Sequence, residues 1–243
     1  MKAFWTHLWI QFKMDLREKG TLLTYYLVPL IFYLIIGAVF SSVNPASKQT
    51  LAAAMPIFAV TMGAVLGMPV PIVKMREAGI LRAFRVNGIP DRAVLLIQSF
   101  SAFLHLTVVS AVILVSAPFL YGADIPKNMG FYVLILFLLL FASIALGLLI
   151  GVSAKSQSIV TMLSQAVFLP TVMLGGIMFP ASMLPEPLRL VGKVLPATHA
   201  MQSFSSLAFG LPSDVNAAVS LLFLIAIGIL AFFLAGVKYR SQS

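Results

Sequence analysis

Six long runs of apolar residues divide this chain, and each is close to the length that a helix needs to cross a lipid bilayer. About 20 apolar residues in helical conformation span the roughly 30 Å of hydrocarbon. We interpret the following residues as membrane spans: 21–40, 51–73, 93–121, 131–153, 159–179 and 215–237. None of the six contains Asp, Glu, Lys or Arg, so we expect an all-α integral membrane protein, with residues 21–243 forming one six-helix domain.

The composition leaves little room for a soluble fold. Of the 243 residues, 60% are apolar and 9% are charged, against about 25% charged residues in a typical soluble domain. The chain has no cysteine, which excludes disulfides and thiol chemistry. The net charge of +9 would suit a nucleic-acid binder, but most basic residues flank the apolar runs, as in the loops of membrane proteins. We therefore expect no nucleic-acid partner.

The distribution of Lys and Arg predicts the orientation of the spans, because cytoplasmic loops carry an excess of these residues. With the N-terminus inside, twelve of the sixteen basic residues fall on the cytoplasmic side and four outside. The twelve are Lys2, Lys13, Arg17, Lys19, Lys74, Arg76, Arg82, Arg85, Arg92, Lys155, Lys238 and Arg240, and the four are Lys48, Lys127, Arg189 and Lys193. Both termini are therefore predicted to be cytoplasmic.

Residues 1–20 are predicted to form an amphipathic helix at the membrane surface. Four apolar residues spaced 4, 3 and 4 apart share one face, and two basic residues elsewhere on the helix can reach anionic headgroups. The apolar residues are Trp5, Trp9, Phe12 and Leu16, and the basic residues are Lys13 and Arg17. The helix could be a simple anchor, or it could also act as a lateral gate or as a contact for a cytosolic partner.

Residues 74–92, between the second and third spans, are the most charged segment. Arginines indicate a cytosolic surface, and three apolar residues give a short helix an apolar side that a plain loop would not need. The arginines are Arg82, Arg85 and Arg92, and the apolar residues are Ile80, Leu81 and Phe84. We interpret the segment as a helix that docks a partner, with a plain positively charged loop as the alternative.

Residues 180–212 are too polar to span the membrane and too apolar to extend freely into water. The segment contains five prolines, namely Pro180, Pro185, Pro187, Pro196 and Pro212. We expect short helices that dip into the outer leaflet as a re-entrant or interfacial cap, with a structured external loop as the alternative.

No set of residues typical of catalysis is present. The chain lacks a Gly-x-x-x-x-Gly-Lys-Ser/Thr phosphate loop, so we expect neither ATP hydrolysis nor another enzymatic activity from it. The three histidines, His7, His105 and His199, lie in different segments without the spacing of metal ligands. His105 is the one ionisable candidate inside a predicted span, and it could be functional or could simply hydrogen-bond a neighbouring span.

Small residues recur four apart in two spans and predict tight helix contacts, within one subunit or between subunits. They are Gly63 and Gly67 in the second span, and Ser143, Gly147 and Gly151 in the fourth.

Six spans, a charged first cytoplasmic connection and a capped outer face resemble the membrane subunit of ABC-2 type transporters. The resemblance covers essentially the whole chain and is carried by two sets of residues. After the second span, Arg76-Glu77-Ala78-Gly79-Ile80-Leu81-Arg82 is similar to the family's Arg-Glu-x-Gly-x-Leu pattern. After the fifth come Gly175-Gly176-Ile177-Met178-Phe179-Pro180, then Met183-Leu184-Pro185 and Leu195-Pro196.

The resemblance implies an exporter that another chain powers. Members of this family pair two six-span subunits, identical or different, with two ATPase subunits. The implied partners are a separate ABC ATPase and a second permease, besides membrane lipid. ATP and Mg²⁺ would bind to the ATPase, and this chain would hold no cofactor. It would lie in the bacterial plasma (inner) membrane and export a hydrophobic or amphiphilic drug, lipid or peptide.

The resemblance also implies roles for particular residues. A coupling helix over roughly residues 75–84 would contact the ATPase through Arg76, Glu77, Gly79, Ile80, Leu81, Arg82 and Phe84. An external gate would involve Gly175, Gly176, Pro180, Pro185 and Pro196. Candidate pathway residues on the second and fifth spans are Thr61, Thr161, Gln165, Phe168 and Thr171. The alternative function is a self-sufficient transporter or channel with His105 as its titrating group.

Overall fold

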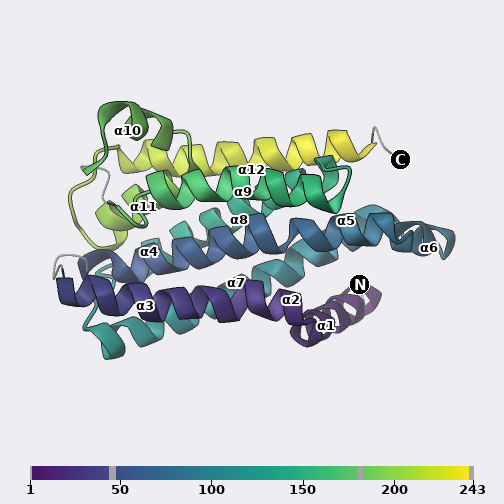
Figure 1. Ribbon diagram of the computed structural model, residues 1–243, viewed down its shortest axis with the longest axis horizontal. Helices are drawn as coiled ribbons and strands as arrows, with labels where there is room; N and C mark the ends of the chain where they lie inside the picture. Colours follow the sequence, from purple (N-terminus) through teal and green to yellow (C-terminus); the bar gives the residue numbers. More distant parts are fainter. Residues whose placement is uncertain (1, 44–47, 180–182, 241–243) are drawn as a thin grey trace.

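The computed structural model describes residues 2–43, 48–179 and 183–240, and all regular secondary structure within these ranges is helical (Figure 1). Six helical segments of these residues are long and apolar enough to cross a membrane. They are Lys19–Ser42, Lys48–Glu77, Asp91–Tyr121, Met129–Ser153, Gln157–Leu174 and Ala217–Arg240. The predicted all-α fold with six spans is confirmed, and the chain is a multi-pass membrane protein.

Some spans consist of more than one helical segment, because short π-helical turns interrupt them. The elements are α1 (Lys2–Arg17), α2 (Lys19–Leu22), η1 (Leu23–Leu27), α3 (Val28–Val43), α4 (Lys48–Thr61), η3 (Met62–Gly67), α5 (Pro69–Glu77), α6 (Ile80–Val86), α7 (Asp91–Tyr121), α8 (Met129–Ser153), α9 (Gln157–Leu174), α10 (Glu186–Gly192), α11 (Pro196–Ser203), η5 (Phe204–Ala208) and α12 (Ala217–Arg240). The first span therefore comprises α2, η1 and α3, and the second comprises α4, η3 and α5.

The second span forms the centre of the bundle, and every residue of α4 from Leu51 to Thr61 is buried. Small residues make this position possible because they let several helices approach the same backbone. A Cβ atom on Gly147 of α8 would lie only 2.0 Å from the carbonyl oxygen of Ala64. Cβ atoms on Gly63 and Gly67 would lie 2.9 and 2.7 Å from the ring of Tyr25. These small residues therefore serve contacts within this chain.

The fifth span ends at Leu174, short of the predicted residue 179. Gly176 adopts a φ of 79°, a left-handed conformation that ends a helix and that side chains disfavour. At Gly175, a Cβ atom would lie 2.9 Å from the Cβ of Ala197, so α11 packs closely against this end of α9. The glycine pair therefore marks the end of the span.

The predicted cap after the fifth span contains two different kinds of helix. α10 is mostly exposed, whereas Pro196–Ala200 of α11 are all buried among neighbouring spans. His199 contacts the carbonyl oxygen of Lys193 through Nε2 at 2.8 Å and the hydroxyl of Ser220 through Nδ1 at 3.2 Å. Burial lowers the pKa of His199 from its usual value. A re-entrant path for the segment stays a prediction, and Pro180 lies outside the described residues.

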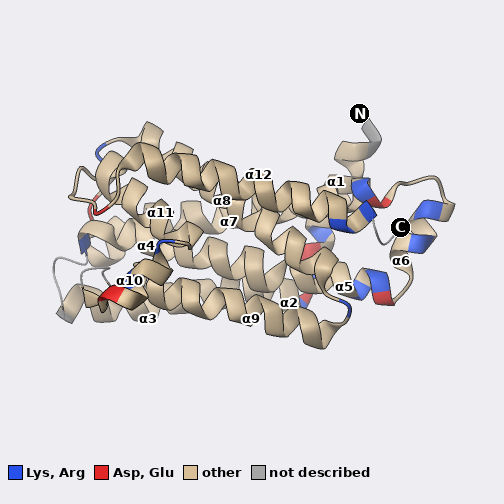
Figure 2. Cartoon of the chain, turned by 90° about the horizontal axis from the view of Figure 1, so that it is seen from above, with Lys and Arg blue, Asp and Glu red and all other residues tan. Residues whose placement is uncertain are grey.

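Both termini lie at one end of the bundle, together with α6, while α10 and α11 lie at the opposite end (Figure 1). Figure 2 shows that Lys and Arg gather at the end that carries the termini. We call this the basic end. Its charge agrees with the asymmetry on which the predicted orientation rests.

Candidate functional site

The connection after the second span is helical on both sides of Gly79. α5 continues the second span to Glu77, and α6 occupies residues Ile80–Val86. Gly79 adopts a φ of 69°, which a residue with a side chain would adopt only under strain. The segment that we predicted as one coupling helix over residues 75–84 is therefore divided, and its first part belongs to the end of the span.

Two of the predicted coupling residues bind the end of α8, the start of α9 and the connection between these helices. The guanidinium of Arg76 donates to the carbonyl oxygen of Val152 at 3.2 Å and also to that of Ala154. The carboxylate of Glu77 accepts from the side-chain Nε2 of Gln157 at 2.7 Å and from its backbone N–H at 3.3 Å. These residues therefore join the second, fourth and fifth spans at the basic end.

α6 projects beyond the spans at the basic end (Figure 1). Leu81 holds it to the bundle with only 6% of its surface exposed. Ile80 is 42% exposed and Val86 is 81% exposed. Arg82 is also exposed and donates to no acceptor among the described residues. α6 thus presents apolar and basic side chains that nothing in the described chain covers. Phe84 is half-buried, and its ring centroid lies 5.6 Å from that of His7 on α1.

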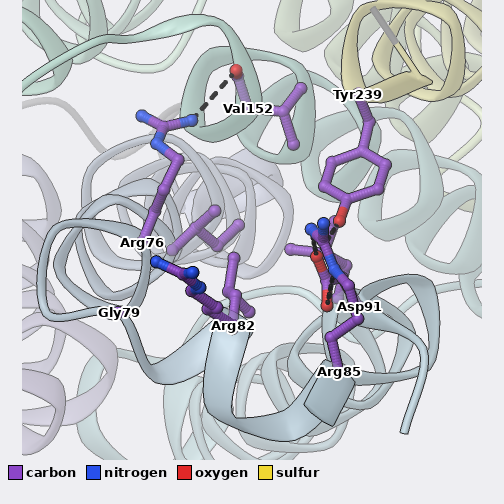
Figure 3. Close-up of a pocket in the computed structure, with 10 residues that line it drawn as sticks. Arg76, Gly79, Arg82, Arg85, Asp91, Val152 and Tyr239 are labelled. Atoms are coloured by element: carbon purple, nitrogen blue, oxygen red, sulfur yellow. Dashed lines mark hydrogen bonds and ion pairs between the residues drawn. The ribbon is translucent and has the colours of Figure 1, made fainter. Parts of the chain in front are cut away.

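A buried carboxylate joins α6 to the third and sixth spans. Asp91 is 4% exposed, and it accepts from the guanidinium of Arg85 and from the hydroxyl of Tyr239 (Figure 3). A buried charge is stable only when it is paired and hydrogen-bonded. The hydrogen bond from Arg85 to Asp91 raises the pKa of Arg85, so the guanidinium stays charged. The sequence offered no signal for Tyr239, which lies 148 residues from Asp91.

A basic cavity of about 320 Å³ lies between α6 and the spans above it. Arg76 and Arg82 line one side of this cavity, and Arg85, Asp91 and Tyr239 line the other (Figure 3). α6 and residues of the second, third, fourth and sixth spans therefore border the same cavity.

A second group of polar side chains lies inside the bundle beside α1. Asp15 is 4% exposed and His105 is fully buried. The Oδ2 atom of Asp15 lies 3.6 Å from Nε2 of His105 and accepts from the hydroxyl of Ser101 at 2.5 Å. The hydroxyl of Tyr26 lies 2.7 Å from Nδ1 of His105. The N-terminal helix and the first and third spans thus share one polar cluster, which we call the Asp15–His105 cluster.

Aromatic rings enclose this cluster. The ring of Phe12 stacks on His105 with centroids 4.2 Å apart, and that of Tyr25 stacks at 5.5 Å. Tyr25 belongs to η1, which packs against the π-helical turn η3 of the second span. Such turns are frequent at functional sites in helical proteins. Sequence reasoning found His105 but missed Asp15. The available signal was spacing, because Asp15 follows Leu8 by seven residues and therefore lies on the same face of α1, and both side chains are buried.

α1 turns Leu8 and Asp15 toward the bundle, so the predicted apolar face looks mostly outward. Its members Trp5, Trp9 and Leu16 are exposed, Phe12 is partly buried, and the basic Lys13 and Arg17 are exposed. Nζ of Lys13 lies 4.9 Å from the ring centroid of Trp9, a cation–π contact. The outward aromatic face suits lipid, and the interfacial location stays a prediction.

The predicted pathway and gate residues do not form one surface. Thr61 and Thr171 are buried inside the chain, Phe168 packs against Phe58, and Thr161 and Gln165 are exposed on α9. In the predicted gate, Gly175 and Pro196 are buried where α9 meets α11, Gly176 lies beside Met201, and Pro185 precedes α10. Among the predicted pathway residues, Thr161 and Gln165 are the exposed ones, and the pathway role stays a prediction.

Comparison with known proteins identifies relatives of this chain. Residues 2–209 match the family described as "ABC-2 type transporter". The chain is 27% identical over 204 residues to the "Probable multidrug ABC transporter permease YbhS" of Escherichia coli K12, and the protein of that name in Escherichia coli O157:H7 matches equally. The matched region covers 82% of this chain and 54% of either relative. The chain thus spans about half the length of the curated relatives it matches.

Proposed function

The chain belongs to the ABC-2 type transporter family, and from this membership we propose that it is the membrane-spanning permease of an exporter driven by a separate ABC ATPase. The observation that carries the proposal is α6, a helix that projects from the basic end with uncovered apolar and basic side chains. An ATPase that pushes on α6 could move the second, third, fourth and fifth spans. α6 follows the second span directly, and Arg76, Glu77 and Arg85 bind residues of the fourth, fifth and third spans, respectively.

The proposal places the basic end in the cytoplasm, where the ATPase and its ATP and Mg²⁺ are found. The excess of Lys and Arg at that end supports this orientation. The membrane would then be the bacterial plasma membrane, with both termini in the cytoplasm.

A second permease subunit would complete the transport pathway. Exposed apolar side chains cover much of the first span, including Ile31, Leu34 and Ile35, and the outward face of α9 carries Thr161 and Gln165. A facing subunit, either identical or different, would leave a path with apolar walls and a few polar groups. Such a path suits a hydrophobic or amphiphilic substrate, and the E. coli relatives bear the name of multidrug permeases.

Purification of the tagged chain from its source organism tests the docking role of α6. We expect an ABC ATPase, identified by mass spectrometry, to co-purify with the wild-type chain and with Val194→Glu, an exposed control at the opposite end. Ile80→Glu places a charge at an exposed apolar position of α6, and Arg82→Glu reverses the charge of an exposed side chain; neither breaks a side-chain hydrogen bond or ion pair among the described residues. Each should reduce the ATPase signal at least tenfold. Undiminished ATPase in both α6 variants would refute the docking role.

The alternative function, a self-sufficient transporter, gains support from the Asp15–His105 cluster, because buried ionisable pairs in membrane proteins often carry protons. Both readings can be compared in vesicles that contain the purified chain without ATPase. Transport driven by a pH gradient alone and abolished by His105→Gln would favour the alternative, whereas transport that requires the ATPase and ATP supports the exporter.

A further inference from the structure

An apolar groove opens at the basic end between α7, α8 and α12. It encloses about 270 Å³. Leu96 of α7, Leu148 of α8 and Phe232 of α12 line it, together with Gly236. A Cβ atom on Gly236 would meet no heavy atom within 4 Å, so the groove is open at this point. Leu96 is 39% exposed and Phe232 is 45% exposed, so the apolar lining is accessible from the side of the bundle.

Two arginines lie at the rim of the groove. Arg92 is in the first turn of α7 and Arg240 is the last residue of α12, and both are exposed. Arg92 makes no hydrogen bond or ion pair with any of the described residues. Asp91, the residue before Arg92, accepts from Arg85 and Tyr239 instead.

The groove adjoins the basic cavity between α6 and the spans, because Leu95, Val152 and Tyr239 line both spaces. A ligand in the groove therefore lies next to the residues that tie α6 to the third and sixth spans. Arg82 adds a further positive charge on the far side of the cavity.

We propose that this groove is a binding site for a phospholipid with an anionic headgroup. Guanidinium groups form strong charge-assisted hydrogen bonds with phosphate oxygens, and basic pockets between spans bind anionic headgroups. The apolar walls would hold part of an acyl chain. The groove is slightly smaller than the roughly 300 Å³ of the smallest typical ligand pockets, so the rest of the lipid would stay in the bilayer.

Native mass spectrometry of the purified chain tests the proposal. The detergent-solubilised protein is titrated separately with phosphatidylglycerol and phosphatidylcholine of identical acyl chains, which differ in net headgroup charge. We expect phosphatidylglycerol to bind at least tenfold more tightly. Arg92→Gln with Arg240→Gln should remove this preference, since each basic residue near a membrane contributes about fivefold to the binding of anionic lipid.

A second variant separates the acyl chain from the headgroup. Gly236→Leu fills the open part of the groove and leaves both arginines, so it should weaken phosphatidylglycerol binding at least fivefold. Gly236→Ala adds one methyl group in open space and is the matched control. Lys127→Gln, at the opposite end, controls for loss of charge. Thermal unfolding of every variant verifies that it is folded.

Three results would overturn the proposal. The first is equal binding of the two lipids by the wild-type chain, and the second is an unchanged preference in the double arginine variant. The third is displacement of phosphatidylglycerol by millimolar inorganic phosphate, which would identify the occupant as a free anion. Loss of lipid selectivity in variants that still retain the ATPase would leave the proposed exporter role intact, so the two proposals fail separately.

Discussion

At the scale of single residues, the Asp15–His105 cluster is the least expected feature of the chain. A carboxylate that is 4% exposed within a helical membrane protein is costly unless other groups pair with it. Here Gln11 and Ser101 donate to it, and Nε2 of His105 lies 3.6 Å from its Oδ2 atom. The cluster therefore holds α1 against the third span through polar contacts that sequence patterns did not reveal.

Replacing His105 by Leu should remove the imidazole beside the carboxylate of Asp15 and leave that carboxylate only its hydrogen bonds from Gln11 and Ser101. We expect destabilisation of about 3–5 kcal/mol, the usual cost of breaking a buried charged pair. Adding Asp15→Leu should restore part of the loss, because no uncompensated charge then remains. Thermal unfolding in detergent measures the effect, with His7→Leu, at a partly exposed histidine on α1, as the control.

The double variant decides whether the two side chains act as a pair. If Asp15→Leu and His105→Leu lower the unfolding midpoint by amounts that simply add, the coupling between them is absent.

At the scale of helices, close approach between the second and fourth spans organises the bundle. The second span is surrounded by neighbours on all sides, and α8 packs against it where Gly147 meets the backbone of Ala64. Because the atom that a new Cβ would meet belongs to the backbone, it cannot rotate away as a side chain could. The whole helix would have to move.

Gly147→Ala should therefore be destabilising by about 1–3 kcal/mol, as is typical of overpacked cores. Gly236→Ala makes the same chemical change at a helical position with open space, and it should be neutral or stabilising by up to about 1 kcal/mol because Ala favours helix. The unfolding midpoints of the two variants provide the comparison. Equal midpoints would contradict the assigned contact.

At the scale of the whole molecule, the uneven distribution of charge gives the protein two different ends. The termini and α6 lie at the basic end, and the buried α11 lies at the other (Figures 1 and 2). In the proposed exporter, the ATPase would act at the basic end, and the predicted gate segment would lie at the opposite end. The spans between them would transmit the motion.

The natural absence of cysteine allows a direct test of orientation. Ser213→Cys introduces an exposed thiol between α11 and α12, and Ser158→Cys introduces one at the basic end, in the first turn of α9. We expect a membrane-impermeant maleimide to label Ser213→Cys in intact spheroplasts and to label Ser158→Cys only after the membrane is permeabilised. The opposite pattern would reverse the assigned orientation.

The spans, their number and the uneven charge were determined by the sequence alone, because each depends on local composition. Twenty apolar residues are required to cross the hydrocarbon whatever the neighbours are, and charged residues mark where a span must end. The resemblance to the ABC-2 family came from two short segments and was confirmed over residues 2–209. The break at Gly79 and the early end of the fifth span followed from glycines whose conformation became visible only in the structure.

The pairing of helix faces was decided only by the tertiary structure. The spans are apolar on every side, so the periodicity that locates the buried face of a soluble helix is weak here. For this reason the sequence did not indicate that Thr61 and Thr171 are buried, or that Thr161 and Gln165 are exposed. The contacts of Asp15 with His105 and of Asp91 with Tyr239 join residues that are distant in the chain, and such contacts depend on how the helices are arranged around the second span.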